Sequence, residues 1–545
     1  MVYQSMVVAD RIAELLQRQG AEHVVGFPEN RLINSAARLG LRPIITRTER
    51  VAVNIADGFA RATNGERLLP CVTQYGPGAE AAFAAVAQAY GDRSPILLVP
   101  TEHAVGDQGS PGSVAIERAY APVTRWSATV NRAEDGPRIF RRALHAARCV
   151  RTGPVLVAVA NDVMNGDAGA AAWDTTPLRP RLTQAAPDDV ADAARRLEAA
   201  HSPVILAGQG VLYAGATDEL VALAELTGTP VATTLNGKSA FPEDHPLALG
   251  TAARTRPATV DSFYARADLV LGVGTSFTRS LYITPLPPRA TLGQIVNDPT
   301  DVGGDYDVDF ACVGDARLVL AQLGAALGGR TFEHRASTAA EVARVRAAFM
   351  ERWMPRLTSD AAPLSPYRVV WELMHVADRA RAVVTHDAGH PRDQIVPFYE
   401  TIVPRGYLGW GKSTQLGTGF GLALGARLAR PDRLAVNIMG DAAFGMIGMD
   451  FETAVRTPIP IVTIVMNNGL MGGYGEWMPD AVARFSSSRL GGDYAGVARA
   501  LGSHAEHVRE PAELRPALER CIACVGDGRP ALLEVMTHEE PEQAE

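Results

Sequence analysis

The sequence predicts an α/β protein with three doubly wound domains, each built around a parallel sheet. Short β-branched runs alternate with helical segments along all 545 residues, and this alternation is typical of parallel sheets. The alternation restarts twice, after a segment rich in Ala, Pro, Thr and Gly at 167–189 and after a charged helical segment at 331–364. A chain of this length can hold three domains of ordinary size. We therefore place the domains at residues 1–166, 188–328 and 364–540.

Composition and charge narrow the class of protein. Hydrophobic residues make up 47% and charged residues 21% of the chain, which is typical of a soluble enzyme. The net charge of −8 favours neither nucleic acid nor an anionic membrane surface as a partner. No apolar run reaches the ~20 residues of a membrane span, and Met1–Gln19 is amphipathic rather than signal-like. With five scattered cysteines, among them the lone Cys521-x-x-Cys524 pair that we expect to be structural, the protein is expected to be cytoplasmic.

In the first domain, one acidic residue stands between a strand and a helix. Glu49 follows the expected strand Ile44–Thr46 and precedes the expected helix Val51–Arg61. A lone Glu at such a position is usually a charge favoured by the helix dipole. Other strands are expected at His23–Phe27, Leu69–Thr73, Pro95–Pro100 and Pro154–Val159, with helices at Val8–Gln17 and from Gly78 to Tyr90.

The second domain repeats a strand followed by a tight turn. Strands are expected at Pro203–Ala207, Pro230–Thr233, Leu269–Val273 and Gly293–Asn297. Glycines after the first and third of these strands would suit a nucleotide phosphate, but neither turn completes a dinucleotide fingerprint. The domain therefore binds an adenine nucleotide, holds a flavin, or serves as a spacer.

In the third domain, polar side chains end two successive strands. The expected strand Leu434–Met439 ends on Gly440-Asp441, and the run Ile459–Val465 ends on Asn467-Asn468. Strand carboxyl ends of a parallel sheet bind ligands at one edge. The Asp441 carboxylate, the Asn468 carbonyl oxygen and the backbone carbonyl at Leu470 would form the oxygen half-shell that Mg²⁺ prefers. The alternative is an ordinary βαβ unit with a strand-end Asp and a helix-capping Asn.

A literal P-loop pattern, Gly406-x-x-x-x-Gly411-Lys412-Ser413, offers a different interpretation. An NTPase would need a buried strand directly before Gly406 and a firm helix after Lys412. Pro404-Arg405 precedes the pattern, and we interpret the later glycines, Gly417, Gly419 and Gly421, as breaking a helix. A P-loop NTPase is thus retained only as a remote alternative.

The third-domain pattern, with Asn468 following Asp441 by 27 positions, resembles the cofactor signature of thiamine-diphosphate enzymes. The usual third-residue Gly of that signature is Ala442 here. Asn54–Arg61 (NIADGFAR) resembles the family helix AxxxADGxAR, and Gly76-Pro77-Gly78 is the matching turn, although the family often has Asn where this chain has Ala81. The resemblance implies pyrimidine-binding, central and diphosphate-binding domains, with thiamine diphosphate and Mg²⁺ as cofactors.

The resemblance also assigns roles to individual residues. Glu49 would stabilise the imino form of the cofactor pyrimidine, helped by a raised pKa in an apolar site, and Leu416 would be the apolar residue that folds the two rings together. The ylid so formed attacks a carbonyl carbon. His390 is either a diphosphate contact or a solvated loop residue. The cofactor-binding residues implied are Gly389, His390, Gln415, Leu416, Gly440, Asp441, Ala442, Ala443, Asn468, Leu470 and Met471, with Asp441, Asn468 and Leu470 at the metal.

The branch of the family is indicated by GDAAFGMIGMDFETAVR, which is similar to oxalyl-CoA decarboxylases and 2-hydroxyacyl-CoA lyases. We therefore predict a lyase that releases formyl-CoA from a short 2-hydroxyacyl-CoA, or that acts on oxalyl-CoA. The alternative is an acetolactate synthase-like carboligase or a 2-oxo acid decarboxylase acting on pyruvate. An inactive scaffold is disfavoured because Glu49, Asp441 and Asn468 are all retained.

Three further expectations follow from this resemblance. Glu476, after the metal Asn, is either a substrate-side acid/base or a solvated charge in a mobile loop. A CoA thioester would need cationic side chains, for which Arg254, Arg256 and Arg279 are available. Because the glutamate domain of one subunit faces the diphosphate domain of another in this family, we expect a homodimer or homotetramer.

Overall fold

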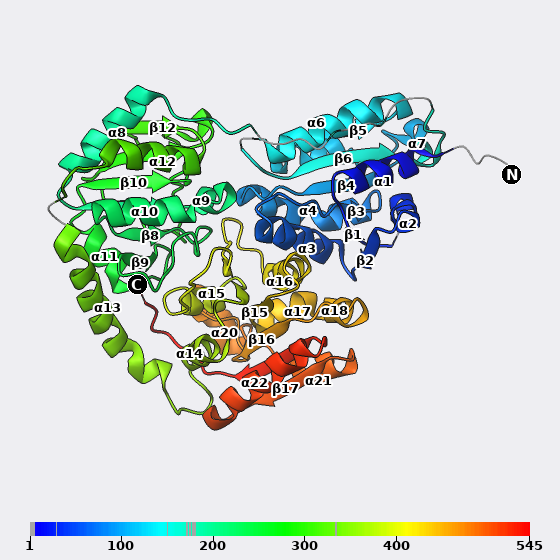
Figure 1. Cartoon of the computed structure of the whole chain (residues 1–545). Coiled ribbons are helices and arrows are strands. Elements are labelled where there is room, and N and C mark those ends of the chain that lie inside the picture. The colour runs from blue at the N-terminus through cyan, green and yellow to red at the C-terminus, as the bar shows by residue number, and fades with distance from the viewer. Residues whose placement is uncertain are drawn as a thin grey trace.

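The computed structural model describes residues 6–28, 30–149, 151–169, 173, 176, 181–332 and 335–544. These residues form three lobes, each with a six-stranded parallel sheet covered by helices (Figure 1). The predicted fold class is therefore confirmed. The N-terminal lobe and the central lobe lie side by side, and the C-terminal lobe packs beneath both (Figure 1).

The sheet of the N-terminal lobe has the strand order β2-β1-β3-β4-β6-β5. Its order reverses between β1 and β3, which places the ends of β2 and β3 at a natural ligand-binding edge. The strands are β1 His23–Gly26, β2 Arg42–Ile45, β3 Cys71–Thr73, β4 Leu97–Glu102, β5 Trp126–Val130 and β6 Val155–Ala160. The helices are α1 Val8–Arg18, α2 Arg31–Arg38, α3 Glu49–Ala62, α4 Pro77–Gly91, α5 Ile116–Tyr120, α6 Gly136–Arg148 and α7 Asn161–Asn165, with short 3-10 turns η1 Val105–Asp107, η2 Ala121–Val123 and η3 Ala133–Asp135.

The C-terminal lobe repeats the same topology, in the order β14-β13-β15-β16-β18-β17. Its switch point lies between β13 and β15. The strands are β13 Ala382–His386, β14 Tyr407–Leu408, β15 Leu434–Gly440, β16 Val462–Asn467, β17 His504–Val508 and β18 Ala531–Met536. The helices are α14 Pro366–Val376, α15 His390–Ile395, α16 Thr418–Ala429, α17 Asp441–Ile447, α18 Phe451–Arg456, α19 Tyr474–Trp477, α20 Pro479–Phe485, α21 Tyr494–Ala500 and α22 Pro511–Gly526, with the 3-10 turn η5 Gly448–Asp450.

The central lobe has a different order, β12-β11-β10-β7-β8-β9, which is the strand order of dinucleotide-binding sheets. Its crevice is expected between β7 and β10. The strands are β7 Pro203–Ala207, β8 Val231–Thr233, β9 Ala248–Thr251, β10 Leu269–Val273, β11 Thr291–Val296 and β12 Phe310–Val313. The helices are α8 Pro187–Ala199, α9 Gln209–Ala214, α10 Thr217–Thr227, α11 Ala258–Tyr264 and α12 Ala316–Leu327, with the 3-10 turn η4 Pro299–Asp301. The long helix α13, Arg335–Leu357, descends from this lobe to the C-terminal lobe (Figure 1).

Each expected strand is present within a few residues, but β5, β9, β12, β14, β17 and β18 were not expected. The strands β5 and β17 are sheet edges whose side chains are mostly half-buried, so their sequences carry no strong apolar run. The helix expected from Val51 begins at Glu49, because the Thr48 hydroxyl accepts the Val51 amide hydrogen and caps the first turn.

The N-terminal and C-terminal lobes are joined by the close packing of α3 against α16. A Cβ atom on Gly58 would lie 2.2 Å from the Leu422 carbonyl oxygen, and one on Gly425 would lie 2.1 Å from the Ile55 carbonyl oxygen. The glycines therefore let the two backbones touch. Our interpretation of the glycines after Lys412 as helix-breaking was wrong from residue 418 onward, because α16 is a continuous, buried helix.

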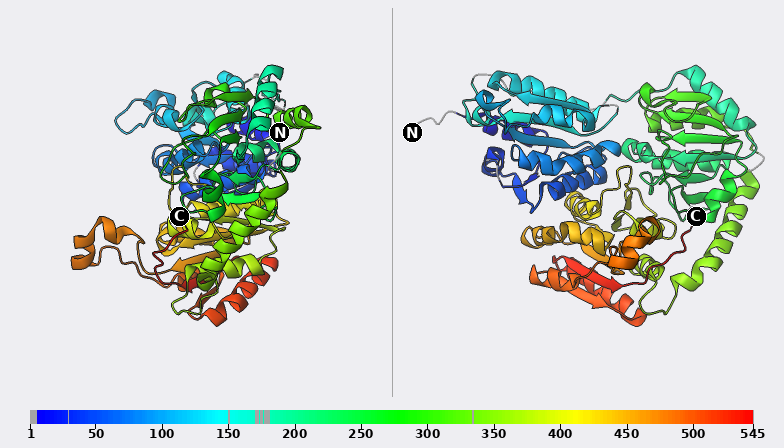
Figure 2. Two further views of the ribbon diagram at one scale, coloured as in Figure 1. Left: turned by 90° about the vertical axis from the view of Figure 1, so that its left-hand side faces the viewer. Right: turned by 180° about the vertical axis from the view of Figure 1, so that it is seen from behind.

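An arm that carries α19 and α20 extends from the C-terminal lobe (Figure 2, left, orange). Its side chains include Trp477, which is 86% exposed, and Phe485, which is 76% exposed. Cys521 and Cys524, in contrast, are buried in the apolar core of this lobe. No helix among the described residues is both long and apolar enough to cross a membrane.

Candidate functional site

The ends of β15 and β16 bring Asp441 beside the segment that follows Asn468. Asp441 accepts hydrogen bonds from the Ala442 amide at 2.8 Å and the Gly469 amide at 2.9 Å. Asn468 accepts one from the Leu470 amide at 3.0 Å, which bends the chain back at Gly469. The side-chain amide of the neighbouring Asn467 donates a hydrogen bond to the Glu534 carboxylate at 2.7 Å, which fixes the end of β16 against β18. Asp441, Asn468 and Leu470 thus meet at one edge, as the sequence pattern indicated.

The Asp441 carboxylate has the character of a cation ligand. It is 3% exposed and forms no ion pair with any residue that the structure describes. Burial raises its pKa, although the amides of Ala442 and Gly469 act in the opposite direction. A bound divalent cation would offset the cost of burying this charge. An all-oxygen set of carboxylate, carboxamide and peptide carbonyl fits Mg²⁺.

Asp387, at the end of β13, was missed by the sequence analysis. It is fully buried and accepts hydrogen bonds from the amides of Ala388, Gly417 and Gly419. Burial raises its pKa to about 6 against the effect of these three amides. Asp387 therefore fixes the start of α16 and the loop before it. Its only sequence signal is its position directly after a buried strand.

The loop held by Asp387 carries two of the predicted cofactor contacts. Leu416 is partly buried and packs against Ala388, Trp410 and Leu422. The Gln415 side-chain oxygen is buried and accepts no hydrogen bond from the described residues. An unsatisfied buried acceptor beside an apolar prop fits a ligand that has both a hydrogen-bond donor and aromatic rings. This arrangement is consistent with the cofactor that the resemblance implies.

Gly389 and His390 lie at the start of α15. Gly389 has a φ of +84°, which glycine adopts readily. The His390 ring packs against the chain after Leu470, since a Cβ atom on Gly472 would lie 2.6 Å from its Nδ1. His390 thus lies next to the segment that follows Leu470 rather than on a free surface.

Glu49 stands at the corresponding edge of the N-terminal sheet. Its Oε1 atom adjoins the Gly76–Gly78 turn, because a Cβ atom on Gly78 would lie 3.1 Å from it. Burial raises the pKa of Glu49, a backbone hydrogen bond lowers it, and the charge of Asp450 raises it again. No arginine or lysine pairs with Glu49 within the described part of the chain. A half-buried carboxyl with a raised pKa suits proton sharing near neutral pH.

The stretch that indicated the acyl-CoA branch has a structural role instead. Asp450 accepts hydrogen bonds from the Arg47 amide at 2.7 Å and the Thr48 hydroxyl at 2.8 Å, directly before Glu49. It also accepts one from Thr453 at 3.0 Å. The GMDFET segment therefore anchors α3 on the C-terminal lobe. Asp450, within this pattern, therefore has a role in packing the two lobes together.

Two other sequence-based expectations have different outcomes. Glu476 lies exposed on α19 with no hydrogen bond or ion pair to a described residue, and its role stays a prediction. The P-loop alternative is wrong, because β14 lies inside the pattern and α16 begins five residues after Ser413. Lys412 points to the central lobe, where its Nζ lies 3.4 Å from the Thr278 hydroxyl.

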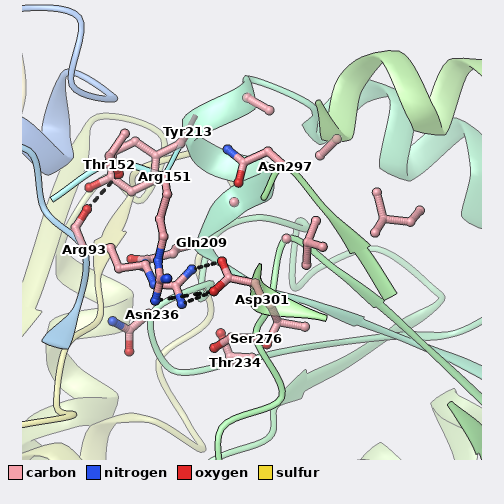
Figure 3. Close-up of a pocket in the computed structure, with 18 of the residues that line it drawn as sticks. Arg93, Arg151, Thr152, Gln209, Tyr213, Thr234, Asn236, Ser276, Asn297 and Asp301 are labelled. Atoms are coloured by element: carbon pink, nitrogen blue, oxygen red, sulfur yellow. Dashed lines mark hydrogen bonds and ion pairs between the residues drawn. The ribbon is translucent and has the colours of Figure 1, made fainter. Parts of the chain in front are cut away.

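The central lobe holds a cavity of about 1030 Å³ at the carboxyl ends of its strands. Its walls include the turns after β7, β8, β10 and β12, together with residues of the N-terminal lobe. Figure 3 shows Arg93 and Arg151 directed at Asp301 on one side of this cavity. Arg254, Arg256 and Arg279, which the sequence analysis offered as a cationic grip, do not line it.

The charges that do line the cavity are mainly positive. Its basic residues are Arg93, Arg148, Arg151, Arg181, Arg317 and Lys412, and its acidic residues are Glu66, Asp301 and Asp315. Two of its glycines serve the fold rather than a ligand, since a Cβ atom on Gly208 would lie 2.3 Å from the Gly274 carbonyl oxygen. A positive cavity at the switch point of a dinucleotide-type sheet favours an anionic nucleotide.

Three models of one protein family match successive parts of the chain. Residues 6–122 match the thiamine pyrophosphate enzyme N-terminal TPP binding domain, 190–323 its central domain, and 387–535 its C-terminal TPP binding domain. The matches follow the three lobes in order.

Similar proteins are acetolactate synthases. The probable acetolactate synthase large subunit of Methanocaldococcus jannaschii is 30% identical, over 97% of this chain and 91% of the relative. The acetolactate synthase large subunit IlvG of Mycobacterium tuberculosis is 31% identical, over 98% and 96%. The acetolactate synthase isozyme 3 large subunit of Escherichia coli is 28% identical, over 97% and 94%. These relatives support the acetolactate synthase alternative better than the predicted acyl-CoA lyase.

Proposed function

This chain belongs to the thiamine pyrophosphate enzyme family, and on that premise we propose that it is an acetolactate synthase-like carboligase acting on pyruvate. The observation that carries the proposal is the similarity to acetolactate synthase large subunits over almost the full length of both chains. The retained Glu49, Asp441 and Asn468 support an active enzyme rather than an inactive scaffold.

The proposed reaction joins two pyruvate molecules. The C1–C2 bond of the first breaks and carbon dioxide leaves. The C2 carbon of the first pyruvate then bonds to the C2 carbon of the second. The carbonyl oxygen of the second pyruvate takes up one proton and becomes the hydroxyl group of acetolactate. When bound, thiamine diphosphate supplies the electron sink that stabilises the carbanion left by decarboxylation.

Residues of this chain would bind the cofactor and control its protons. Asp441, Asn468 and the Leu470 carbonyl would hold Mg²⁺, which in turn binds the diphosphate. Gly440, Ala442 and Ala443, with small side chains beside the opening amides of α17, would leave room for it, and Gly389, His390 and Met471 would border it. Leu416 would support the folded rings next to Gln415. Glu49 would hold or release the pyrimidine proton, which its raised pKa favours.

We further propose a homodimer or homotetramer with active sites between subunits. The exposed apolar side chains of the C-terminal lobe support this, because they gather on the segments that follow the Asp441 and Asn468 strand ends. They are Met446, Met449, Tyr474, Trp477 and Phe485, with Val497 on α21 as one further case. Exposed apolar surface of this kind commonly marks a protein interface.

The central cavity is proposed to bind an anionic nucleotide, either a flavin or an adenine nucleotide. The strand order, the volume of about 1030 Å³ and the excess of basic side chains support this proposal. Absorbance of the purified protein near the flavin band tests for a bound flavin. Mass spectrometry of the nucleotides released by denaturation tests for a bound adenine nucleotide.

Product analysis tests the main proposal. The purified protein is supplied with thiamine diphosphate and Mg²⁺ and offered pyruvate, 2-hydroxyisobutyryl-CoA and oxalyl-CoA in parallel. We expect acetolactate from pyruvate and no turnover of the thioesters. Formyl-CoA from either thioester, with pyruvate unchanged, would restore the acyl-CoA lyase. The same assay is run on Glu49→Gln, which should form acetolactate much more slowly. Its control is Glu341→Gln, which changes a surface carboxylate that pairs with Arg266.

A further inference from the structure

Three side chains that can bind a metal meet where β17 packs against α22 in the C-terminal lobe (Figure 1). They are His504 and Glu506 of β17 and Cys521 of α22. A ring nitrogen, a carboxylate oxygen and the thiol sulfur each lie within 4.8 Å of the other two. No second group of this kind occurs in the part of the chain that the structure describes. We call these three residues the edge cluster, because β17 is the outermost strand of its sheet.

The edge cluster is formed by one face of a strand and the inner face of a helix. Alternate residues of a strand point to the same side of the sheet, so His504 and Glu506 share the face of Val508, which is buried in the same core as Cys521. Cys521 is fully buried, on the side of α22 that covers this face. The side chains of His504 and Glu506 are 30% and 19% exposed, so an ion from solvent can reach the space between the three residues.

The edge cluster is separate from the proposed cofactor site. His504 is the first residue of β17 and pairs with Ala531, the first residue of β18. The cluster therefore lies at the amino end of these strands. Asp441 and Asn468, in contrast, follow the carboxyl ends of β15 and β16.

The pair Cys521-x-x-Cys524 offers at most two ligands, and a zinc site normally has four. In the structure, however, the other ligands next to Cys521 come from β17 and not from a second cysteine pair. No local sequence pattern connects Cys521 with His504 and Glu506, because the contact depends on how α22 packs on the strand.

Without a metal, the charges at the edge cluster are balanced. Glu506 Oε1 shares a hydrogen bond with His504 Nε2 at 2.9 Å. Arg520 donates to both carboxylate oxygens of Glu506, at 3.0 Å to Oε1 and 2.6 Å to Oε2, and so neutralises it. Burial raises the pKa of the Cys521 thiol to about 12, the charges of Glu506 and Cys524 raise it as well, and that of Arg520 lowers it. The thiol is therefore protonated near neutral pH.

We propose that the edge cluster binds a zinc ion, with His504 Nε2, Glu506 Oε1 and the Cys521 thiolate as ligands and water in the fourth position. Zinc takes nitrogen, sulfur and carboxylate oxygen together. Its bonds of about 2.0–2.3 Å place ligand atoms about 3.3–3.8 Å apart, so roughly 1 Å of side-chain movement closes the spacing in the structure. When the sulfur–zinc bond forms, the thiol proton passes to solvent, and the ring proton of His504 resides on Nδ1. Arg520 competes with the ion for Glu506, because both are cations.

Cobalt and zinc titrations of the holoenzyme test this proposal. The protein is freed of transition metals with a chelator and then saturated with thiamine diphosphate and Mg²⁺, so that the proposed Mg²⁺ site cannot accept the probes. A thiolate ligand to Co²⁺ produces a sulfur-to-metal charge-transfer band in the near ultraviolet. We expect this band on addition of Co²⁺, and its loss on addition of Zn²⁺, because thiolate ligands favour zinc.

Two cysteine variants locate the metal. Cys521→Ala should abolish the cobalt band. Cys149→Ala is the matched control and should keep it, because Cys149 is also next to a histidine, with its sulfur 3.1 Å from His145 Nδ1, but lies in the N-terminal lobe. Zn²⁺ should raise the melting temperature of the wild type and of Cys149→Ala, and leave that of Cys521→Ala unchanged. Melts without metal establish that both variants are folded.

Two further variants change the half-exposed side of the cluster and leave the buried thiol intact. His504→Gln should weaken Zn²⁺ binding at least about tenfold, since even the residues that support metal ligands cost about 10–100-fold when they are removed. Arg520→Gln removes the competing cation and should tighten Zn²⁺ binding. Competition with a chelator of known zinc affinity measures both effects.

Several results would overturn the proposal. The first is the absence of a thiolate band in the wild type. A band that survives in Cys521→Ala and disappears in Cys149→Ala would assign the metal to the Cys149–His145 pair. Unchanged zinc affinity in both His504→Gln and Arg520→Gln would show that the ion does not bind beside β17. Because none of these measurements uses turnover, they are independent of whether pyruvate is the substrate.

Discussion

The contact between α3 and α16 leads to a prediction about the single substitution Gly425→Ala. A Cβ atom at this position would lie 2.1 Å from the Ile55 carbonyl oxygen and 2.5 Å from the Phe59 amide nitrogen. Both obstacles are backbone atoms of α3, so no side-chain rotation can relieve the overlap. The two helices would have to separate, which would shift α16 and the preceding loop that Asp387 holds through the amides of Gly417 and Gly419.

The expected change in the free energy of unfolding follows from two opposing effects. Replacing Gly by Ala inside a helix normally stabilises it by about 1 kcal/mol. Overpacking a close contact costs about 1–3 kcal/mol, and the upper end applies where backbone is the obstacle. We therefore expect a net loss of about 2 kcal/mol, which lowers the melting temperature by roughly 4–8 °C for a domain of this size.

Thermal melts and thiamine diphosphate titrations measure both consequences. The matched control is Gly324→Ala in α12, where an added Cβ atom meets nothing within 4 Å. The control should be as stable as the wild type or more so, with unchanged cofactor affinity. Gly425→Ala should melt earlier and bind the cofactor more weakly. If Gly425→Ala matched the control in both measurements, the reasoning that the α3–α16 contact positions the site would be refuted.

Three further predictions concern single side chains. Glu49→Gln should lower the rate of acetolactate formation by about 10²–10⁴-fold while cofactor binding persists, as measured by steady-state assay and calorimetry; loss of binding with a normal rate at saturation would contradict the proton role. Asp441→Asn should raise the Mg²⁺ concentration needed for half-maximal activity, and an unchanged Mg²⁺ titration would remove Asp441 from the metal site. The Asp387 pKa of about 6 lies above its unfolded value of 3.8, so the ionised folded form is penalised by about 3 kcal/mol at pH 7, and this penalty disappears as the pH falls from about 6 to 4. The melting temperature of the wild type relative to Asp387→Asn should therefore rise as the pH falls through that window, and parallel curves would contradict the assignment.

Much of the fold, and the meeting of Asp441 with the segment after Asn468, could be predicted from the sequence. Asp441 and Asn468 each follow a buried apolar run, and parallel sheets bring such strand ends together. Asp387 has the same position after β13 but escaped notice, because no second polar residue follows it at a known spacing. Its importance comes from the amides of Gly417 and Gly419, which lie 30 and 32 residues away.

Features that depend on contacts between lobes could not be predicted in this way. Arg93 and Arg151 are distant in sequence from the turns of the central lobe, yet they line its cavity, whereas the nearby Arg254, Arg256 and Arg279 do not. The glycines of α16 looked like helix breakers because their partners in α3 are invisible in a local pattern. The GMDFET segment was assigned to a substrate branch for the same reason, although Asp450 serves to hold Arg47 and Thr48.

The most direct test of the central claim uses pyruvate labelled with carbon-13 at C2. The holoenzyme with thiamine diphosphate and Mg²⁺ is followed by nuclear magnetic resonance. The account predicts acetolactate with two adjacent labelled carbons, visible as carbon–carbon coupling, together with release of unlabelled carbon dioxide, and it predicts the loss of this signal in Glu49→Gln. Labelled acetaldehyde without a coupled product would mean simple decarboxylation. Unchanged pyruvate with a bound cofactor would contradict pyruvate as the substrate.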